Sequence, residues 1–460
     1  MHKTLARLIL AFFTSLSFSH ANAKPNVILI NVDDLGWADV GYQGSTFYET
    51  PHIDKLSTQG AVFSNAYAAA ANCAPSRASL LTGVYTPRHG VYTVNNSDRG
   101  NSADRKLIPT KNTQSIKVGE LSLGQAMQRA GYITANIGKW HVSENPTRYG
   151  FDVNIAGSAE GGPYQGGYKS PYKYPNLVND EPGEYLTDRL TDEAIKFITT
   201  HKAKPFFLYL PYFAIHTPLQ PKPEVLAKFK EKKGTPAQSN ATYAAMVSTL
   251  DDNIGKLMSS LNSLQLTKNT IVIFTSDNGG VYKTSKQTPL RAGKGSYYEG
   301  GIRQPLIIRW PNKVKPSKIN TPVSQIDLYA TLLDITNTKL NGKELDGVSL
   351  NPLLQGLTIP QRPLYWHFPV YIQGGNDQSQ DPKFRTRPGS AIREGDWKLI
   401  QYFEDNSIEL YNLKYDISEE NNLVSSYSSK VEDLTAKLEA WRKKLNAPVP
   451  SEQNPEYLAK

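Results

Sequence analysis

Four short apolar runs constrain the fold of this chain more than any other feature. They are rich in β-branched and aromatic residues, as is typical of strands that are buried on both faces. The runs cover residues 27–32, 132–137, 206–210 and 269–275. Stretches with helical spacing separate them, so the pattern predicts an α/β fold in which helices sandwich a large, mostly parallel mixed sheet. In such sheets the ligand crevice lies beyond the carboxyl ends of the strands.

Polar side chains follow every one of these four runs. In chain order they are Asp33 and Asp34, then Lys139 and His141, then His216, and last Asp277 and Asn278. Each set alone is also typical of an ordinary turn or loop, and a solvated turn is the alternative for the adjacent aspartates. Two carboxylates at the end of a buried strand are costly unless something such as a divalent cation neutralises them. Together the four sets predict one crevice that holds acids, bases and an amide.

The only cysteine among the 460 residues lies in the segment CAPSRASLLTG, residues 73–83. Pro75 suits a first helical position and Gly83 suits a left-handed helix end. Cys73 would then lie at a helix N-terminus, where free N–H groups and the helix dipole favour an anion. Arg77 would point its guanidinium at the same place. The alternative is a buried free thiol without a chemical role.

The segment CAPSRASLLTG resembles the signature of the type I sulfatases, which belong to the alkaline-phosphatase-like superfamily. In that family a formylglycine-generating enzyme or an anaerobic maturase oxidises this cysteine to formylglycine (3-oxoalanine), and the hydrated aldehyde is the nucleophile. The resemblance extends over nearly the whole mature chain. It implies hydrolysis of sulfate esters on a carbohydrate, and the expected substrate is a sulfated polysaccharide or oligosaccharide, for instance a marine algal one.

The resemblance also implies roles for the polar residues. The expected ligands of a calcium ion are Asp33, Asp34, Asp277, Asn278 and the modified Cys73. All-oxygen ligation suits a hard cation, whereas zinc would call for His or Cys ligands. Arg77 would hold the nucleophile in its hydrated form. Lys139 and Lys294 would neutralise the sulfate oxygens, where charge is concentrated in the transition state.

The mechanism expected from this resemblance has two steps. One hydroxyl of the gem-diol attacks sulfur in line, Asp277 takes its proton, and His216 protonates the departing sugar oxygen as general acid. This leaves a sulfate ester on residue 73. His141 then removes the proton of the second hydroxyl, the aldehyde re-forms and sulfate leaves.

Residues 1–23 have the pattern of a secretory signal peptide. Lys3 and Arg7 flank the start of an apolar run over residues 8–18, and Ala21-Asn22-Ala23 fits a cleavage site. We therefore expect an exported protein, periplasmic or secreted, with an uncleaved anchor helix as the alternative. No other run is apolar for long enough to span a membrane, so no stable membrane anchor is expected. A single cysteine excludes an internal disulfide.

The texture of the sequence changes after Pro363. Residues 24–362 form the predicted catalytic domain. Short alternating segments then predict antiparallel strands over residues 390–393, 397–403 and 409–412, and a terminal amphipathic helix follows at 431–445. Residues 363–460 are thus expected to form a smaller C-terminal subdomain with an antiparallel sheet and a helix.

The formal net charge is +9, from 51 Lys and Arg against 42 Asp and Glu. These charges are scattered without a dense basic run, so nucleic acid is not the expected partner. A modest positive excess suits an anionic polymer such as a sulfated glycan, although ordinary solubilising lysines explain it as well. Composition leaves the oligomeric state open.

Further residues are candidates for substrate binding, each with a structural alternative. The loop over residues 156–175 carries Tyr164, Tyr168, Tyr172 and Tyr174, which could stack on sugar rings or simply pack. The other candidates are Arg88, His89, Arg148, Trp366 and His367. Two other functions compete with sulfatase activity: a phosphatase or phosphonate monoester hydrolase of the same superfamily, and a catalytically silent glycan-binding protein.

Overall fold

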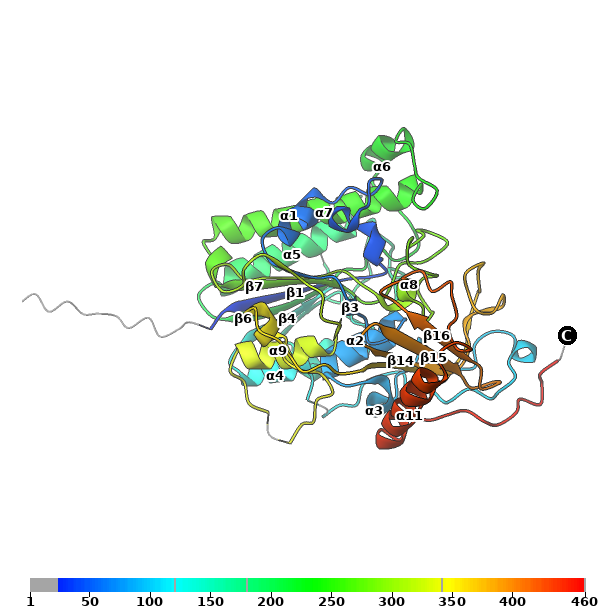
Figure 1. Ribbon diagram of the computed structural model, residues 1–460. Helices are drawn as coiled ribbons and strands as arrows, with labels where there is room; N and C mark the ends of the chain where they lie inside the picture. Colours follow the sequence, from blue (N-terminus) through cyan, green and yellow to red (C-terminus); the bar gives the residue numbers. More distant parts are fainter. Residues whose placement is uncertain (1–23, 120, 179–180, 341, 459–460) are drawn as a thin grey trace, which may run out of the picture.

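A larger sheet, a smaller sheet, two short two-stranded sheets and the helices packed on them make up the described structure (Figure 1). The computed structural model describes residues 24–119, 121–178, 181–340 and 342–458. The predicted signal peptide, residues 1–23, lies outside the described residues. Among the described residues, no helix is long and apolar enough to cross a membrane.

The larger sheet has eight strands. In order across the sheet they are β5 (Val153–Ile155), β4 (Ile133–Ile137), β6 (Phe206–Pro211), β1 (Asn26–Val32), β7 (Thr270–Ser276), β8 (Leu306–Arg309), β2 (Ala61–Phe63) and β9 (Ser317–Ile319). The strands from β5 to β7 are all parallel, and β8 runs antiparallel to both of its neighbours. The predicted large, mostly parallel mixed sheet is therefore confirmed, and the four apolar runs form its central strands β4, β6, β1 and β7.

Helices cover both faces of this sheet (Figure 1). One layer is α1 (Pro51–Ser57), α5 (Leu186–His201) and α7 (Ala241–Ser263), and the other is α2 (Cys73–Thr82), α4 (Leu123–Arg129) and α9 (Asp327–Ile335). The side chains of β1 alternate between the two layers, because successive residues of a strand point to opposite faces. Ile28 and Ile30 pack with the first layer, whereas Val27 and Leu29 pack with the second.

The smaller sheet is antiparallel and lies in the C-terminal part of the chain. Its strands, in order, are β11 (Leu364–Phe368), β14 (Gly389–Glu394), β15 (Trp397–Tyr402) and β16 (Ile408–Asn412). Helix α11 (Ser428–Lys444) packs on one face, where Leu434 and Leu438 contact the buried cluster of this sheet. The predicted smaller sheet with a terminal helix is confirmed. The predicted domain boundary near residue 363 directly precedes β11.

Short elements connect these layers. They are β3 (Ala66–Tyr67), β10 (Val323–Ser324), the pair β12 (Ile372–Gln373) and β13 (Phe384–Thr386), and the helices α3 (Thr86–His89), α6 (Pro223–Lys230), α8 (Glu299–Ile302) and α10 (Asn351–Leu354). The β12–β13 hairpin belongs to the C-terminal part of the chain, yet Arg385 on β13 reaches the backbone of Lys294, which precedes strand β8 of the larger sheet. This contact matters for the site described below.

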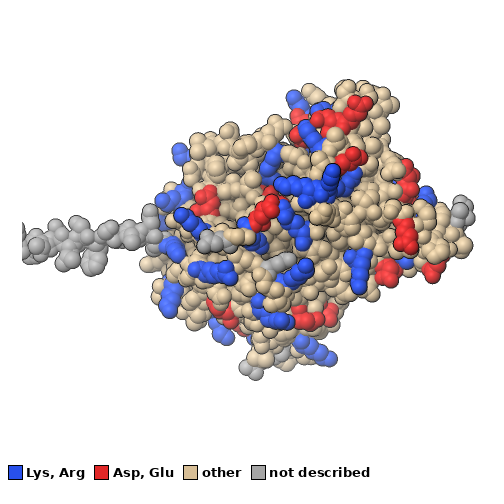
Figure 2. All heavy atoms as spheres, turned by 90° about the horizontal axis from the view of Figure 1, so that it is seen from below, with Lys and Arg blue, Asp and Glu red and all other residues tan. Residues whose placement is uncertain are grey.

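Lys and Arg side chains are spread over the surface. Figure 2 shows the face seen from below, where they lie scattered among Asp and Glu. On this face the basic residues form no continuous band of the kind that tracks a nucleic-acid backbone.

Candidate active site

The carboxyl ends of the four central strands bring the predicted polar residues together. Strands β4, β6, β1 and β7 are neighbours in that order, so their ends meet at one edge of the sheet. Hydrogen bonds continue the pairing beyond the strands: Asp33 N–H donates to the Ala214 carbonyl (2.9 Å), and Asp277 N–H donates to that of Val32 (3.0 Å). The predicted convergence on one crevice is therefore observed.

The acidic residues at this edge form one buried cluster. Asp33 and Asp277 are fully buried, and Asp34 is nearly so. The Asp34 N–H donates to Asp277 Oδ1 at 3.2 Å, and Asn278 Nδ2 donates to Asp34 Oδ1 at 2.8 Å. The alternative of a solvated turn at Asp33-Asp34 is wrong, because these carboxylates face the interior.

Each of the three carboxylates has its own cation. Lys139 Nζ lies 2.6 Å from Asp33 Oδ2, and Lys294 Nζ lies 2.5 Å from Asp34 Oδ1. Arg77 Nε donates to Asp277 Oδ2 at 2.8 Å. Buried charges require such partners, and these pairs fix the positions of both signs of charge.

Burial and these cations shift the pKa of the three carboxylates in opposite directions. Burial raises the pKa of Asp33 to about 6, although Lys139 opposes the rise. Burial likewise raises the pKa of Asp277 against the effect of Arg77. For Asp34, burial also acts upward, but Lys294 and other cations outweigh it and hold the pKa below its ordinary value.

Cys73 lies at the N-terminus of α2, as predicted, but it is the first helical residue, so Pro75, expected at that position, is the third. The Asn72 side chain caps the helix by accepting the Cys73 N–H at 3.0 Å, and Gly83 ends it in the left-handed conformation with φ of 72°. The thiol is buried but lines the main cavity. Burial raises the pKa of this thiol, yet Lys139 and Lys294 outweigh that effect and favour the thiolate. Such surroundings do not fit an inert core thiol.

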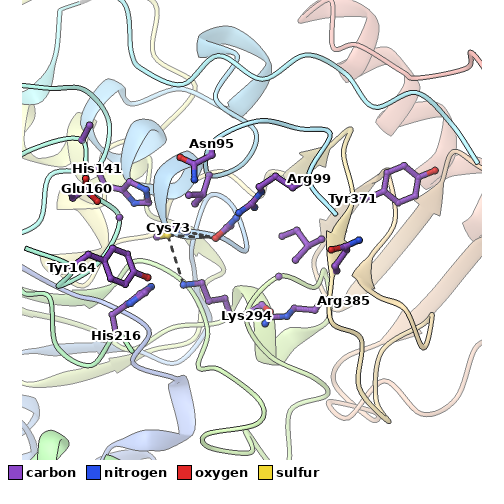
Figure 3. Close-up of a pocket in the computed structure, with 17 residues that line it drawn as sticks. Cys73, Asn95, Arg99, His141, Glu160, Tyr164, His216, Lys294, Tyr371 and Arg385 are labelled. Carbon is purple, nitrogen blue, oxygen red and sulfur yellow. Dashed lines mark hydrogen bonds between the residues drawn. The ribbon is translucent and has the colours of Figure 1, made fainter. Parts of the chain in front are cut away.

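Two histidines flank Cys73 (Figure 3). His141 has φ of 67°, an uncommon conformation for a residue with a side chain. Its backbone N–H donates to the Ser158 carbonyl at 2.9 Å. Burial lowers the pKa of His141 well below its ordinary value, and Lys139 adds to this. His216 Nδ1 lies 2.6 Å from the Thr217 carbonyl oxygen, and its Nε2 lies 3.9 Å from Asp34 Oδ2. Burial also lowers the pKa of His216, against the effect of Asp34.

A cavity of about 780 Å³ opens onto these groups. Its lining includes Cys73, His141, His216 and Lys294, all predicted as site residues. Sequence reasoning missed the other polar residues of its wall, which are Asn72, Asn95, Arg99, Glu160, Tyr371, Gln373 and Arg385. Figure 3 shows Arg99 and Arg385 on the opposite side of Cys73 from Glu160 and Tyr164.

The four tyrosines of the 156–175 loop divide into two groups. Tyr164 lines the cavity with 59% of its surface exposed, and its ring lies edge-on to His216. Tyr168, Tyr172 and Tyr174 are buried in the core. Tyr164 can therefore stack on a sugar, whereas the structural alternative holds for the other three.

Four of the predicted substrate residues lie away from this cavity. Arg88 pairs with Asp346 at 3.0 Å and lines a separate cavity. His89 is buried against Ser79 Oγ at 2.9 Å. Trp366 donates from Nε1 to the Ala68 carbonyl at 2.8 Å, and His367 contacts Ser390 Oγ and the Pro448 carbonyl in the interior. Their interior or ion-paired positions do not fit the predicted contact with substrate.

Arg148, the fifth predicted substrate residue, lies beside the main cavity. It lines an adjoining cavity of about 390 Å³. The two cavities share Asn95, His141 and Ala159 in their walls. Arg148 is therefore placed where an extended ligand that leaves the main cavity on this side would meet it.

The buried cluster has the donors that a hard cation requires. Among the described residues, Asp33 Oδ1 and Asn278 Oδ1 are buried acceptors without a hydrogen-bond partner. Ligand atoms of Asp33, Asp34 and His216 lie within 4.8 Å of one another. Carboxylate and amide oxygens gathered in this way can hold a divalent metal ion.

The comparisons with known proteins agree with this site. The family model described as Sulfatase matches residues 25–338, and the model described as N-sulphoglucosamine sulphohydrolase, C-terminal, matches residues 293–446. A sulfatase of Formosa agariphila is 34% identical over 93% of this chain and 90% of its own length. An N-acetylgalactosamine-6-O-sulfatase of Bacteroides thetaiotaomicron is 30% identical over 91% of this chain and 93% of its own.

A solved structure adds the same relationship in three dimensions. The crystal structure of Ps i-CgsB in complex with k-i-k-neocarrahexaose superposes with a TM-score of 0.77 and 31% identity, and covers 95% of each chain. The match thus spans both the larger domain and the C-terminal sheet. The chain belongs to the sulfatase family and is an enzyme that hydrolyses sulfuric esters.

Proposed function

We propose that this sulfatase removes sulfate groups from a sulfated polysaccharide or oligosaccharide. The single observation that carries the proposal is the arrangement of Cys73, Lys294 and the two flanking histidines in one cavity of about 780 Å³. A cavity of this volume accommodates a sugar as well as the sulfate. The solved relative with a bound oligosaccharide and the relative named for a sugar 6-O-sulfate support the carbohydrate class.

We propose that Cys73 is matured to formylglycine by a formylglycine-generating enzyme or an anaerobic maturase. The hydrated aldehyde would supply the nucleophilic hydroxyl that a thiol lacks. The positive charges of Arg77 and Lys294 act on residue 73 and would stabilise an anionic or strongly polarised group there. Asp277, held by Arg77, is the proposed acceptor of the nucleophile's proton.

We propose calcium as the cation of the buried cluster. Asp33, Asp34, Asp277 and Asn278 would hold it together with the oxygen of modified Cys73. When bound, the ion would supply positive charge against a sulfate oxygen. The unpartnered oxygens of Asp33 and Asn278 support this assignment.

The side chains around the cavity divide the remaining work. Lys294, on the cavity wall, neutralises sulfate oxygens, an interaction that strengthens as charge develops in the transition state. Lys139, which is fully buried and paired with Asp33, is the proposed second cation. His216, on the cavity wall, protonates the sugar oxygen that leaves. His141, whose pKa is lowered well below its ordinary value, is neutral at working pH and can take a proton in the second step. Tyr164 and Arg148 are the proposed contacts to sugar.

The proposed cellular location is outside the cytoplasm, in the periplasm or the medium. The signal-peptide pattern over residues 1–23 supports it. A sulfated polymer, such as one from marine algae, would be met there.

Two measurements on the purified enzyme test the proposal. Mass spectrometry of the peptide that carries Cys73 should show the aldehyde or its hydrate. Initial rates on nitrophenyl sulfate should exceed those on nitrophenyl phosphate, and a panel of sulfated oligosaccharides should release sulfate, with Cys73→Ala as the inactive control. Preference for the phosphate ester, or full activity with an unmodified thiol, would contradict the proposal.

A further inference from the structure

Two arginines in the wall of the main cavity have no carboxylate partner in the described part of the chain. Arg99 comes from the loop that precedes α4, and Arg385 comes from β13 of the C-terminal hairpin. Neither guanidinium has a carboxylate oxygen within 4.0 Å among the residues that the structure describes. Arg387, only two residues further, pairs with Glu404 at 2.8 Å. An unpaired arginine is therefore not the rule for this hairpin.

The hydrogen bonds that the two arginines do make are long. Arg99 Nη2 donates to Thr93 Oγ1 at 3.4 Å. Arg385 Nε donates to the Gly374 carbonyl at 3.4 Å, and its Nη1 donates to the Lys294 carbonyl at 3.5 Å. Bonds of this length satisfy a guanidinium poorly, so most of its five N–H groups remain available to a ligand.

The backbone around both arginines is nevertheless held in place. Arg105 Nη1 donates to the Arg99 carbonyl at 2.8 Å. A Cβ atom added to Gly100 would lie 1.7 Å from Gln373 Nε2, so the loop and the hairpin are in close contact. The contact between Arg385 and the Lys294 backbone ties the hairpin to the residue proposed to bind the scissile sulfate. The backbone segments that carry the two arginines are thus held close to each other in the cavity wall.

The charge distribution of the wall favours an anion on this side. Arg99, Lys294 and Arg385 all contribute positive charge, and Glu160 is the only carboxylate in the described lining of the cavity. Figure 3 shows Glu160 on the other side of Cys73 from the two arginines. Burial lowers the pKa of Arg385, the charge of Asp34 opposes this effect, and the like charge of Arg99 adds to it. The like charges of Arg99 and Arg385 repel each other, and an anionic ligand bound directly to both would relieve that cost.

We propose that Arg99 and Arg385 bind a second anionic group of the substrate, a sulfate or a carboxylate, in addition to the sulfate that is cleaved. This inference rests on the proposed carbohydrate sulfatase function and narrows the substrate to glycans that carry at least two acidic groups near each other. The planar fork of arginine matches both anions through paired N–H···O bonds. The second anion would lie on the Lys294 and hairpin side of the cavity, away from Tyr164.

The test compares substrates that differ only in the second anion. Initial rates are measured for a monosulfated, a disulfated and a sulfate-plus-carboxylate oligosaccharide, and for nitrophenyl sulfate. The variants are Arg99→Gln, Arg385→Gln and the double variant, with Arg129→Gln as the control because Arg129 is exposed on α4 and lines a different cavity. Calorimetric binding of the same oligosaccharides to Cys73→Ala protein gives a readout that does not need turnover.

We expect each single variant to lower kcat/KM for the two dianionic substrates about 10-fold to 100-fold, mainly through KM, as is usual for a lost charged hydrogen bond. The monosulfated sugar and nitrophenyl sulfate should change by less than about two-fold, as should all substrates with the control variant. Whichever dianionic substrate wild type prefers identifies the second anion as sulfate or carboxylate.

Three outcomes would overturn the inference: equal losses on monoanionic and dianionic substrates, no loss on any substrate, or no preference of wild type for a dianionic one. Failure of the proposed function looks different, because no carbohydrate would then release sulfate while nitrophenyl sulfate still did. In that case arginine-dependent binding of the disulfated sugar to Cys73→Ala protein would still uphold the second anion site, and equal binding by the double variant would refute it.

Discussion

Lys294 Nζ lies 3.9 Å from Cys73 Sγ, so one ammonium group serves both the residue proposed as nucleophile and the acidic cluster. The same Nζ contacts Asp34 Oδ1 at 2.5 Å. Lys294 thus connects Cys73 with the acidic cluster. It is also the cation of the cluster that lines the open cavity, since Lys139 is fully buried.

Replacement of Lys294 by Met is expected to lower kcat/KM for every sulfate ester by about 100-fold or more. The transition state would lose a fixed positive charge next to the sulfate oxygens. Rates on nitrophenyl sulfate and on a sulfated sugar measure the effect, with Lys283→Met as the control because Lys283 is exposed. Full turnover of Lys294→Met on nitrophenyl sulfate would show that this lysine does not stabilise the reacting sulfate.

Loss of His216 is expected to lower kcat more for a substrate with a poor leaving group than for one with a good leaving group. A sugar alkoxide needs a proton as it departs, whereas nitrophenolate does not. His216→Ala should therefore cut kcat on a sulfated sugar about 100-fold or more while nitrophenyl sulfate is affected far less. Equal losses on both substrates would contradict the role of general acid.

The protonation of His216 should also make kcat/KM depend on pH. Burial lowers the pKa of His216, so its protonated form is lost at a lower pH than for an ordinary histidine. A general acid works only when protonated, and kcat/KM for a sulfated sugar should therefore fall as pH rises through a value below 6.5, the ordinary pKa of histidine. This descending limb should be absent from His216→Ala. A limb that persists in the variant would belong to another group.

Removal of divalent metal is expected to lower the melting temperature by several degrees, and calcium should restore it. A ligand that binds only the folded state at about 100 times its Kd contributes about 2.7 kcal/mol. Asn278→Ala should weaken calcium binding, because it removes an amide oxygen that has no other partner. Calorimetric titration of chelator-treated protein measures this directly. Unchanged calcium affinity in Asn278→Ala would exclude this residue as a ligand.

The conformation of the 156–175 loop is expected to control His141. A Cβ atom at Gly161 would lie 2.5 Å from His141 Nε2, closer than two such atoms can approach. Gly161→Ala should therefore displace the imidazole ring and lower kcat about 10-fold or more, with little change in melting temperature because the position is only half-buried. Wild-type kcat in this variant would show that the ring position is not critical for turnover.

Local sequence pattern predicted the centre of the site because strand ends follow simple rules. The residues that follow each buried parallel strand lie at the same edge of the sheet. That rule placed Asp33, Asp277, His141 and His216 together without any knowledge of loop conformation. Pro75 and Gly83 likewise indicated a helix that begins near Cys73, and the structure adds Asn72 as its N-cap.

The cavity wall could not be predicted in the same way. Arg99 and Arg385 are 286 positions apart in the chain, and neither follows a strand of the main sheet. Trp366 shows the reverse error, because Leu364, Trp366 and Phe368 alternate along β11 and all face the core. Period-two alternation already indicated that this tryptophan is buried. Its place at the start of the C-terminal segment favoured a sugar contact that the structure does not support.

A buried charge triad in the C-terminal part of the molecule is expected to govern stability. Lys398 Nζ lies 3.0 Å from Glu299 Oε1 and 2.7 Å from Glu419 Oε1, and all three side chains are fully buried. Glu299 belongs to α8, so the triad joins that helix to the smaller sheet. Lys398→Met would remove the ion-pair partner of Glu419 and leave Glu299 paired with Arg303, whose Nε lies 3.6 Å from Glu299 Oε2, a loss of about 3–5 kcal/mol.

The loss should depend on pH in a defined direction. Burial already raises the pKa of Glu419 to about 7, while Lys398 lowers it and Glu299 raises it. Without Lys398 the pKa rises further, so the folded state keeps a proton that the unfolded state releases near the ordinary value of 4.5. Folding stability then falls as pH increases above that value. Melting curves of Lys398→Met should therefore show a larger loss at pH ~8 than at pH ~5, whereas Lys443→Met, an exposed control on α11, should show none. Equal losses at both pH values would mean that packing, and not charge, sets the contribution of Lys398.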